Sequence, residues 1–289
     1  MSQTCSKKHA YLIIAHNNFG QLQQLIDLLD DERNDIYLHI DKKAKDFQME
    51  NLRAIHSRVS IVNRVSVTWG GHSQIQSEME LLKAAGVKHY QHYHLLSGAD
   101  LPLKTQDEIH AFFNENIKKN YISYDDDSVR EKFYYRTQYY YLLRNYIGRK
   151  QDFATKILVR VENLSLKLQK KLGIKRKQIV PFYKGANWFS ITDEMVQYVL
   201  CNQDIIRKQF YYSFCGDEVF LQSLAMASPY SDTIVRDALR ATDWNRGTPY
   251  VYRKEDVPEL LNSEKLFGRK FEMGVDSDAI HMIVENVGK

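Results

Sequence analysis

The stretch Ala10-Tyr11-Leu12-Ile13-Ile14-Ala15-His16-Asn17-Asn18-Phe19-Gly20 decides the fold that this sequence predicts. Its first six residues form a short apolar run typical of a buried strand, and the polar residues and glycine behind them break that run. From Leu22 to Leu29, apolar residues then recur at helical spacing. A strand, a loop and a helix in this order begin an α/β protein.

The alternation of strands and helices continues to about residue 124. Further short apolar runs predict strands at residues 36–40, 59–62 and 93–96. Two capping boxes, Ser73 with Gln76 and Thr105 with Glu108, predict the starts of helices. This order predicts a Rossmann-like, mainly parallel sheet with right-handed crossovers and flanking helices.

Polar residues follow three of these strands. His16, Asp41 and Asp100 come directly after a predicted strand or after the short loop behind it. Parallel α/β sheets bind their ligands beyond the carboxyl ends of the strands. We therefore predict that these three side chains contact a ligand.

The remaining residues extend a single domain over residues 1–289. Residues 128–180 are predicted to form a helical, basic insertion, and no long Gly/Ser-rich or Pro-rich linker separates it from the flanking halves, 10–124 and 181–289. The second half is predicted to contain a strand at 187–191, a helix that starts at Thr192 and another helix from Gly216 onward.

Composition places the chain among globular proteins. It has 289 residues, 44% of them hydrophobic, and no apolar run near the ~20 residues that cross a bilayer. The polar start, without a signal-peptide core, predicts a cytoplasmic protein. Cys5, Cys201 and Cys215 lack metal-binding spacing and are predicted to be reduced thiols.

Basic residues concentrate between Lys167 and Lys177, close to the Tyr-rich residues 133–144, although the net charge is only +4. Such a cluster favours an anionic partner. Three interpretations stay open. The cluster would contact an anionic membrane, bind nucleic acid through phosphate contacts and stacking, or be a solvated helix face without a partner.

Known sequence motifs limit the classes of enzyme and of metal site to which this sequence can belong. Neither GxGxxG nor GxxxxGK[ST] occurs, which disfavours dinucleotide oxidoreductases and P-loop enzymes. Asp125-Asp126-Asp127 has a spacing that can hold Mg²⁺ or Mn²⁺, although three aspartates after a strand are more often a polar turn. His89, His92 and His94 lack a zinc-ligand pattern and are predicted to pack in the structure.

The stretch Tyr212-Ser213-Phe214-Cys215-Gly216-Asp217-Glu218-Val219-Phe220-Leu221 places two carboxylates where an apolar helix is predicted to begin. A carboxylate in that position stabilises the helix start, and it is also available as a catalytic base. Arg253 and Lys270 follow later as two separated cations. One base and two cations suit the transfer of a group from a diphosphate.

Segments across nearly the whole chain resemble the core-2/I-branching β-1,6-N-acetylglucosaminyltransferase family, which also contains peptide xylosyltransferases. The similar stretches are residues 10–16, His39-Ile40-Asp41, Thr68-Trp69-Gly70, residues 96–105, Gly185-Ala186-Asn187-Trp188-Phe189, Gly216-Asp217-Glu218 and residues 266–271. The resemblance implies a GT-A-like fold, a UDP-sugar donor, inversion of the anomeric centre and no metal cofactor.

The resemblance also implies roles for individual residues. Glu218 matches the catalytic base, Arg253 and Lys270 match the cations that replace a metal at the diphosphate, and Asp41 matches a uridine-side contact. The ligand predicted at the sheet edge is then the donor, and residues 10–124 are the nucleotide-binding half.

On the acceptor side, Trp244 resembles an aromatic contact, and we predict that Asp217 binds the acceptor as well. Residues 181–289 are then the acceptor and catalytic half. Eukaryotic relatives carry a membrane anchor, a stem and disulfides, and their absence from this sequence resembles a bacterial cytoplasmic form, peripheral on the inner face of the membrane.

The sequence therefore predicts an inverting, metal-independent transferase that moves N-acetylglucosamine from a UDP-sugar to a glycan hydroxyl. The acceptor is predicted to be a glycan or lipid-linked oligosaccharide in bacterial surface polysaccharide synthesis. The alternatives are a metal-dependent transferase that uses residues 125–127, a transferase of UDP-xylose or another UDP-hexose, and a non-catalytic basic protein that binds nucleic acid.

Overall fold

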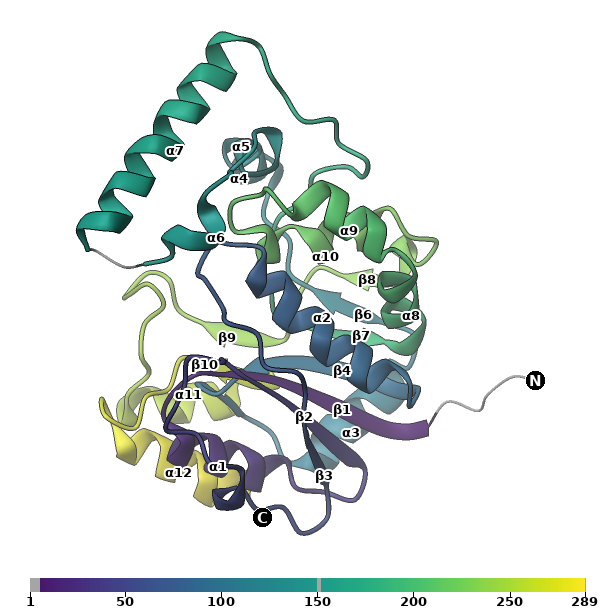
Figure 1. Cartoon of the computed structure of the whole chain (residues 1–289). Coiled ribbons are helices and arrows are strands. Elements are labelled where there is room, and N and C mark those ends of the chain that lie inside the picture. Colours follow the sequence, from purple (N-terminus) through teal and green to yellow (C-terminus); the bar gives the residue numbers. More distant parts are fainter. Residues whose placement is uncertain (1–5, 150–151, 289) are drawn as a thin grey trace.

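The computed structural model describes residues 6–149 and 152–288 (Figure 1). Within these residues a seven-stranded sheet has the order β3-β2-β1-β4-β7-β6-β8. Its strands are β1 (Ser6–Ala15), β2 (Asn34–Ile40), β3 (Arg58–Ile61), β4 (Tyr90–Ser97), β6 (Asn120–Ile122), β7 (Phe189–Thr192) and β8 (Ile234–Val235). Neighbouring strands are parallel except at β7, which is antiparallel to both β4 and β6. The predicted mainly parallel sheet is confirmed.

Helices cover both faces of this sheet, because each helix buries one apolar stripe against it (Figure 1). One core takes apolar residues from α1 (Phe19–Leu29), α3 (Gln106–Glu115), α11 (Val257–Asn262) and α12 (Ser277–Val287). The core on the other face takes them from α2 (Ser73–Gly86), α8 (Asp193–Cys201), α9 (Gln203–Phe210) and α10 (Phe220–Met226).

A second, three-stranded sheet within the described residues has the order β5-β10-β9. Its strands are β5 (Asp100–Pro102), β9 (Arg240–Thr242) and β10 (Phe267–Arg269). β10 pairs antiparallel with β5 and parallel with β9, so that Arg269 lies opposite Asp100. Figure 1 shows this small sheet beside the edge where β1 ends. It therefore brings the late part of the chain to the predicted ligand-binding edge.

The predicted insertion is helical in its first part. It contains α4 (Asp127–Lys132), α5 (Tyr135–Gln138), α6 (Arg144–Ile147) and α7 (Phe153–Lys171), and residues 174–188 then run without regular structure. Figure 1 shows α7 standing away from the two layers of helices that cover the sheet. Short 3₁₀ turns lie at Met49–Asn51 (η1), Gly216–Glu218 (η2), Ser231–Thr233 (η3) and Lys254–Asp256 (η4).

Helices begin at or next to Ser73, Thr105 and Thr192, as predicted, but the capping box predicted for Ser73 and Gln76 is absent. Thr105 and Glu108 form a capping box at α3, and Thr192 caps α8 by accepting a hydrogen bond from Met195 N. Ser73, in contrast, is the first residue of α2 and makes no cap. Its Oγ instead accepts a hydrogen bond from Thr68 N at 2.7 Å, because the preceding loop folds back onto it.

Two of the three cysteines lie within the described residues, and the helices of these residues can be compared with the length of a membrane span. Cys201 is exposed, Cys215 is buried, and both are free thiols, as predicted, whereas Cys5 lies outside the described residues. Across 6–149 and 152–288, no helix combines the length and apolar character that crossing a bilayer requires.

Candidate active site

His16 and Asp41, which are predicted to bind the sugar donor, lie side by side at the carboxyl edge of the parallel strands. Asp41 N donates to Ala15 O at 2.9 Å, which joins the ends of β1 and β2. Partial desolvation lowers the pKa of His16, the nearby Asp41 carboxylate opposes this shift, and Lys270, Lys43 and Arg149 reinforce it. Lys270, which lies 254 positions later in the sequence, is thus one of the cations that influence the pKa of His16.

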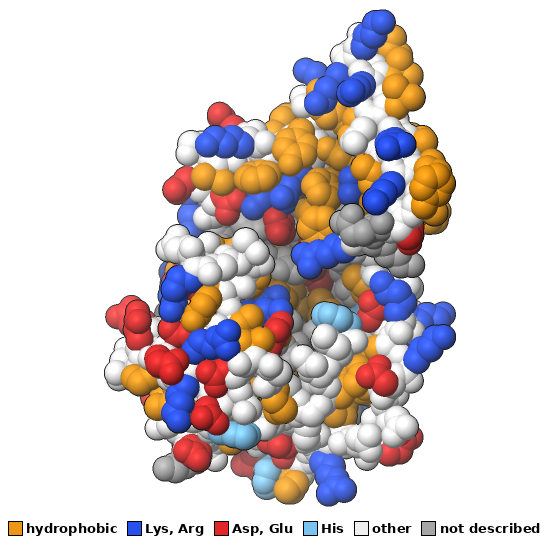
Figure 2. All heavy atoms as spheres, turned by 90° about the vertical axis from the view of Figure 1, so that its left-hand side faces the viewer, with side chains coloured by type: hydrophobic (Ala, Val, Ile, Leu, Met, Phe, Trp, Pro, Cys, Tyr) orange, Lys and Arg blue, Asp and Glu red, His pale blue; other side chains and the backbone are white. Residues whose placement is uncertain are grey.

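Figure 2 shows that the face formed by these strand ends is hollowed, with Lys and Arg side chains gathered around the hollow. Asp41 is buried at this edge, where its Oδ1 accepts from Lys43 N at 2.9 Å. Cations that surround a hollow favour an anionic ligand in it.

Asp100 is also at this edge but is fully buried. Its carboxylate accepts hydrogen bonds from Ser97 N and Ser97 Oγ, both at 2.8 Å, and from Arg269 Nη1 at 2.6 Å. The Arg269 guanidinium lies 4.4 Å from the centre of the Trp188 ring. Asp100 therefore positions Arg269 and the chain that leads to Lys270, and direct contact between Asp100 and a donor stays a prediction.

The two predicted cations belong to neighbouring segments. Tyr252 N donates to Lys270 O at 2.9 Å, and Arg253 is the residue after Tyr252. The backbone segments that carry the two cations are therefore hydrogen-bonded to each other. The Arg253 side chain is exposed, with Nη1 donating to Val275 O at 2.7 Å, and Lys270 forms an ion pair with Glu272. Arg253 is held by the Val275 carbonyl and Lys270 by the Glu272 carboxylate, and a diphosphate can compete with these partners for both cations.

Glu218 ends the 3₁₀ turn η2 rather than starting an α-helix at Gly216. Cys215 has the left-handed conformation with φ of 47°, and α10 begins only at Phe220. Glu218 Oε2 accepts from Arg136 Nη1 at 2.6 Å and lies 3.4 Å from Lys184 Nζ. Among the described residues nothing donates to the other oxygen, Oε1, and the side chain is about one-third exposed at 36%.

Asp217, in contrast, is buried behind Glu218. Its Oδ2 accepts from Gln74 Nε2 at 2.7 Å, and burial, reinforced by the Glu218 charge, raises the pKa of Asp217 to about 7. Burial and the Asp217 charge likewise raise the pKa of Glu78. Asp217 thus faces the protein interior, and its contact with an acceptor stays a prediction.

Trp244 lies in the loop after β9 and is 62% exposed. Asp243 holds this loop, because its carboxylate accepts from Asn245 N at 2.7 Å and from Arg246 Nε at 2.5 Å. An exposed indole on a braced loop provides a flat apolar surface that can stack on a sugar ring. This arrangement is compatible with an acceptor contact, which stays a prediction.

The acidic run 125–127 does not converge on one point. Asp125 Oδ2 pairs with Lys184 Nζ at 2.7 Å, and Asp127 pairs with Arg130 on its own helix at 3.1 Å. Asp126 is the residue before α4. In the part of the chain that the structure describes, no three His, Cys, Asp or Glu side chains are grouped so as to hold a metal ion. The geometry favours the polar-turn interpretation of this run.

Sequence reasoning missed Arg136, Lys184 and Gly185 as parts of the site. A Cβ at Gly185 would lie 1.9 Å from Ser123 O, so only glycine allows this segment to pass. Gly185 N donates to Glu218 O at 3.1 Å, and Lys184 is thereby held against the Glu218 carboxylate. The glycine in Gly185-Ala186-Asn187 was the available signal, whereas nothing local marked Arg136.

Two aromatic side chains, Trp69 and Phe214, are in contact with each other and with arginines of the site. The Trp69 and Phe214 rings lie 5.7 Å apart, Arg149 lies 4.6 Å from the Trp69 ring centre, and Arg136 lies 5.6 Å from the Phe214 ring centre. Arg149 acts on His16, and Arg136 binds Glu218. The Trp69 and Phe214 rings therefore connect Arg149, which influences the pKa of His16, to Arg136, which binds Glu218.

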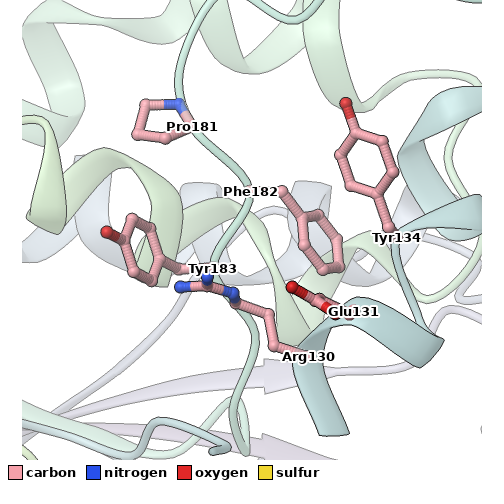
Figure 3. Close-up of a pocket in the computed structure, with 6 residues that line it drawn as sticks. All are labelled: Arg130, Glu131, Tyr134, Pro181, Phe182 and Tyr183. Carbon is pink, nitrogen blue, oxygen red and sulfur yellow. The ribbon is translucent and has the colours of Figure 1, made fainter. Parts of the chain in front are cut away.

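A separate pocket of about 310 Å³ lies between α4 and residues 181–183. Figure 3 shows its aromatic lining, with the Arg130 guanidinium beside the Tyr183 ring at 4.7 Å. Tyr134 packs edge-on against Phe182 at 5.3 Å. The pocket adjoins the Glu218 cluster along the chain, because Lys184 directly follows Tyr183.

A Rossmann-like sheet with one reversed strand, a small second sheet and a hollow at the strand ends define a GT-A-like fold. The chain belongs to the Core-2/I-Branching enzyme family, whose model matches residues 9–265. The fold and the family suggested by the sequence motifs are both confirmed.

Among characterised proteins, the chain is similar to xylosyltransferases. It is 24% identical to xylosyltransferase 2 of Canis lupus familiaris, over 95% of this chain and 33% of that protein. It is 25% identical to xylosyltransferase 1 of Rattus norvegicus, over 94% of this chain and 34% of that protein, and 25% identical to xylosyltransferase 1 of Homo sapiens, over 94% and 29%. The chain thus spans about a third of the length of these relatives.

Proposed function

We propose that the protein is a glycosyltransferase that uses a UDP-sugar and inverts the anomeric centre. The observation that carries this proposal is Glu218, whose Oε2 is held by Arg136 and Lys184 while Oε1 accepts no hydrogen bond within the described residues. In the proposed step, the acceptor hydroxyl oxygen bonds to the anomeric carbon and the bond from that carbon to the diphosphate oxygen breaks. Oε1 takes the hydroxyl proton.

Inversion follows from a single displacement. A retaining route through the enzyme would require a second carboxylate as nucleophile, close to the first. Asp217, the neighbouring carboxylate, is buried and bonded to Gln74. Its placement favours a supporting role over direct attack.

Arg253 and Lys270 are proposed to neutralise the departing UDP without a metal ion. Fixed cations placed where negative charge develops stabilise the leaving group, and the backbones that carry Arg253 and Lys270 are joined by the hydrogen bond from Tyr252 N to Lys270 O. The competing metal-dependent reaction would need Asp125 to leave Lys184, to which it is bonded at 2.7 Å.

The comparisons support two different UDP-sugars as the donor. The family includes branching enzymes, which supports the predicted UDP-N-acetylglucosamine, whereas the similar proteins are xylosyltransferases, which supports UDP-xylose. The proposed acceptor is a glycan hydroxyl, carried by a lipid in bacterial surface polysaccharide synthesis at the inner face of an anionic membrane. The exposed Trp244 and the basic α7 support this acceptor side.

Release of UDP from a panel of UDP-sugars, with and without EDTA, tests the proposal because donor hydrolysis is detectable before the acceptor is known. We expect UDP release from UDP-N-acetylglucosamine or UDP-xylose, unchanged by EDTA. Loss of release in EDTA with recovery in Mn²⁺ would support the metal-dependent alternative. No release from any donor, together with nucleic acid that co-purifies after nuclease treatment, would support the non-catalytic alternative.

A further inference from the structure

Helix α7 has its polar side toward the protein and its apolar side toward solvent. Thr155, Glu162 and Gln169, spaced by seven residues, are the buried ones. Glu162 accepts from Arg144 Nη2 at 2.5 Å, and Gln169 bonds both the N and the O of Tyr140, at 2.8 and 2.9 Å. A helix that covers a core buries its apolar stripe instead, as α12 does with Ile280 and Ile283. The contacts of α7 with the domain are therefore polar anchors.

The outward side of α7 carries a continuous apolar stripe. Its residues are three or four positions apart and therefore share one face: Phe153, Ile157, Val161, Leu164, Leu168 and Leu172. Phe153 is 78% exposed, and Leu164 is 68% exposed. Figure 2 shows the orange side chains aligned along the projecting helix, with basic side chains beside them. An apolar patch of this extent marks an interaction surface.

The charges on α7 indicate what covers the stripe. Basic side chains are exposed along the helix: Lys156, Arg160, Lys167, Lys170 and Lys171. Within Phe153–Lys171 the one acidic residue is Glu162, which is buried and paired. Two copies of the chain joined through this face would bring like charges together, whereas anionic lipid headgroups match both the apolar stripe and the cations.

One residue of the basic run does not belong to this surface. Arg176 is buried, and its guanidinium donates to Ser213 Oγ at 3.2 Å and to Lys208 O at 3.2 Å. It holds the returning segment against α9, whereas Lys175 and Lys177 remain exposed. A surface role for Arg176, expected from the sequence, is wrong.

We propose that α7 is an interfacial helix, which lies in the plane of an anionic membrane with its apolar stripe at the acyl boundary. This proposal deepens the membrane location proposed above, and it does not depend on which sugar is transferred. The anchors of α7 connect it directly to the site, because Arg144, which binds Glu162, also lies 4.4 Å from the Phe214 ring centre. A membrane-bound α7 would hold the hollow beside a lipid-carried acceptor.

Vesicle flotation of the full chain tests the proposal without donor or acceptor. We expect binding to vesicles of phosphatidylcholine with phosphatidylglycerol, little binding to phosphatidylcholine alone, and release in moderate salt. The variant Ile157→Gln/Leu164→Gln/Leu168→Gln and the variant Lys167→Gln/Lys170→Gln/Lys171→Gln should each weaken binding by about tenfold or more. These side chains are exposed, so circular dichroism and the melting temperature should match the parent protein.

A matched control replaces exposed apolar residues elsewhere, Ile55→Gln/Val87→Gln/Ile117→Gln, and should leave binding unchanged. Equal binding to neutral and anionic vesicles, or full binding by the α7 apolar variant, would overturn the proposal. A dimer in light scattering that the α7 apolar variant abolishes, with no vesicle binding by the parent protein, would instead assign the stripe to self-association.

Discussion

Two adjacent carboxylates, Asp217 and Glu218, differ entirely in their surroundings. Glu218 is partly exposed and touches two cations, whereas Asp217 is buried and receives the amide of Gln74. Only an accessible carboxylate can take a proton from an acceptor hydroxyl, so the difference in exposure separates the two roles. The same comparison makes Lys184 and Arg136 positioning residues for Glu218.

Replacement of Glu218 by Gln should reduce transfer by about 10²–10⁴-fold, because the amide keeps the shape of the side chain but accepts no proton. Folding and UDP binding should be retained. Asp217→Asn is the matched control and should cost less activity. Steady-state kcat with the identified donor and acceptor measures both, and near-normal kcat in Glu218→Gln would show that the base is another group.

Replacement of Arg253 or Lys270 by Ala should weaken UDP binding, because each change removes a cation proposed to contact the diphosphate. Titration calorimetry in EDTA measures the affinity. Lys254→Ala is a control, since Lys254 pairs with Asp278 at 3.3 Å on the exposed surface. Binding that disappears in EDTA and returns with Mn²⁺ would contradict the role of these cations.

At the scale of elements, the irregular segment 184–188 positions two side chains of the site, Lys184 and Trp188. It connects Lys184 at Glu218 to Trp188 at Arg269, and it passes against the Ser123 backbone. Asp125 N donates to Lys184 O at 2.8 Å, which fixes the segment on its other side. The close backbone approach explains why a glycine stands at this position.

Gly185→Ala should therefore lower both stability and activity. The new Cβ would meet Ser123 O at 1.9 Å, so the segment must move away and take Lys184 from Glu218. We expect a lower melting temperature and a kcat reduced by at least about tenfold. Gly274→Ala serves as the control, because a Cβ there meets nothing within 4 Å. Normal kcat in Gly185→Ala would separate this segment from catalysis.

At the scale of the whole molecule, a cluster of imidazoles lies inside the core between β1, β4 and α3. The His9 ring stacks on that of His110 at 4.0 Å, and His94 Nε2 lies 3.2 Å from His9 Nδ1. Burial lowers the pKa of His92 and of His110 to about 4, and it lowers the pKa of His9 and His94 as well. These rings are neutral in the folded protein at pH 7.

Acidification should consequently destabilise the fold. The unfolded chain takes up these protons near its pKa of about 6.5, so the stability is fully present above that pH and is lost as pH falls toward 4. Asp217 and Glu78, whose pKa values are raised by burial, oppose this trend over the same range.

A single substitution isolates the contribution of one imidazole. His92→Phe should flatten the dependence of the unfolding free energy on pH by about 1.4 kcal/mol per pH unit between about pH 6 and 4.5. Denaturant titrations at several pH values measure this slope. The exposed His281→Gln should leave it unchanged, and an unaltered slope in His92→Phe would mean that His92 is charged in the fold.

Local patterns in the sequence determined the elements and the family. The apolar run at 10–15, the capping box at Thr105 and the order of short motifs depend on neighbouring residues, and the fold and family match followed from them. His16, Asp41 and Glu218 were predicted in this way because the ends of parallel strands and a pair of acidic residues are visible in one dimension.

Only the tertiary structure decided which partners these residues have. Arg136 binds Glu218, which is 82 positions away in the sequence, and the small sheet brings Arg269 to Asp100, which is 169 positions away. At such sequence separations, the spacing of residues carries no information about their geometry. The orientation of α7 was equally hidden. Its amphipathic pattern predicts a helix, but only the polar contacts of Glu162 and Gln169 with the domain turn its apolar stripe toward solvent.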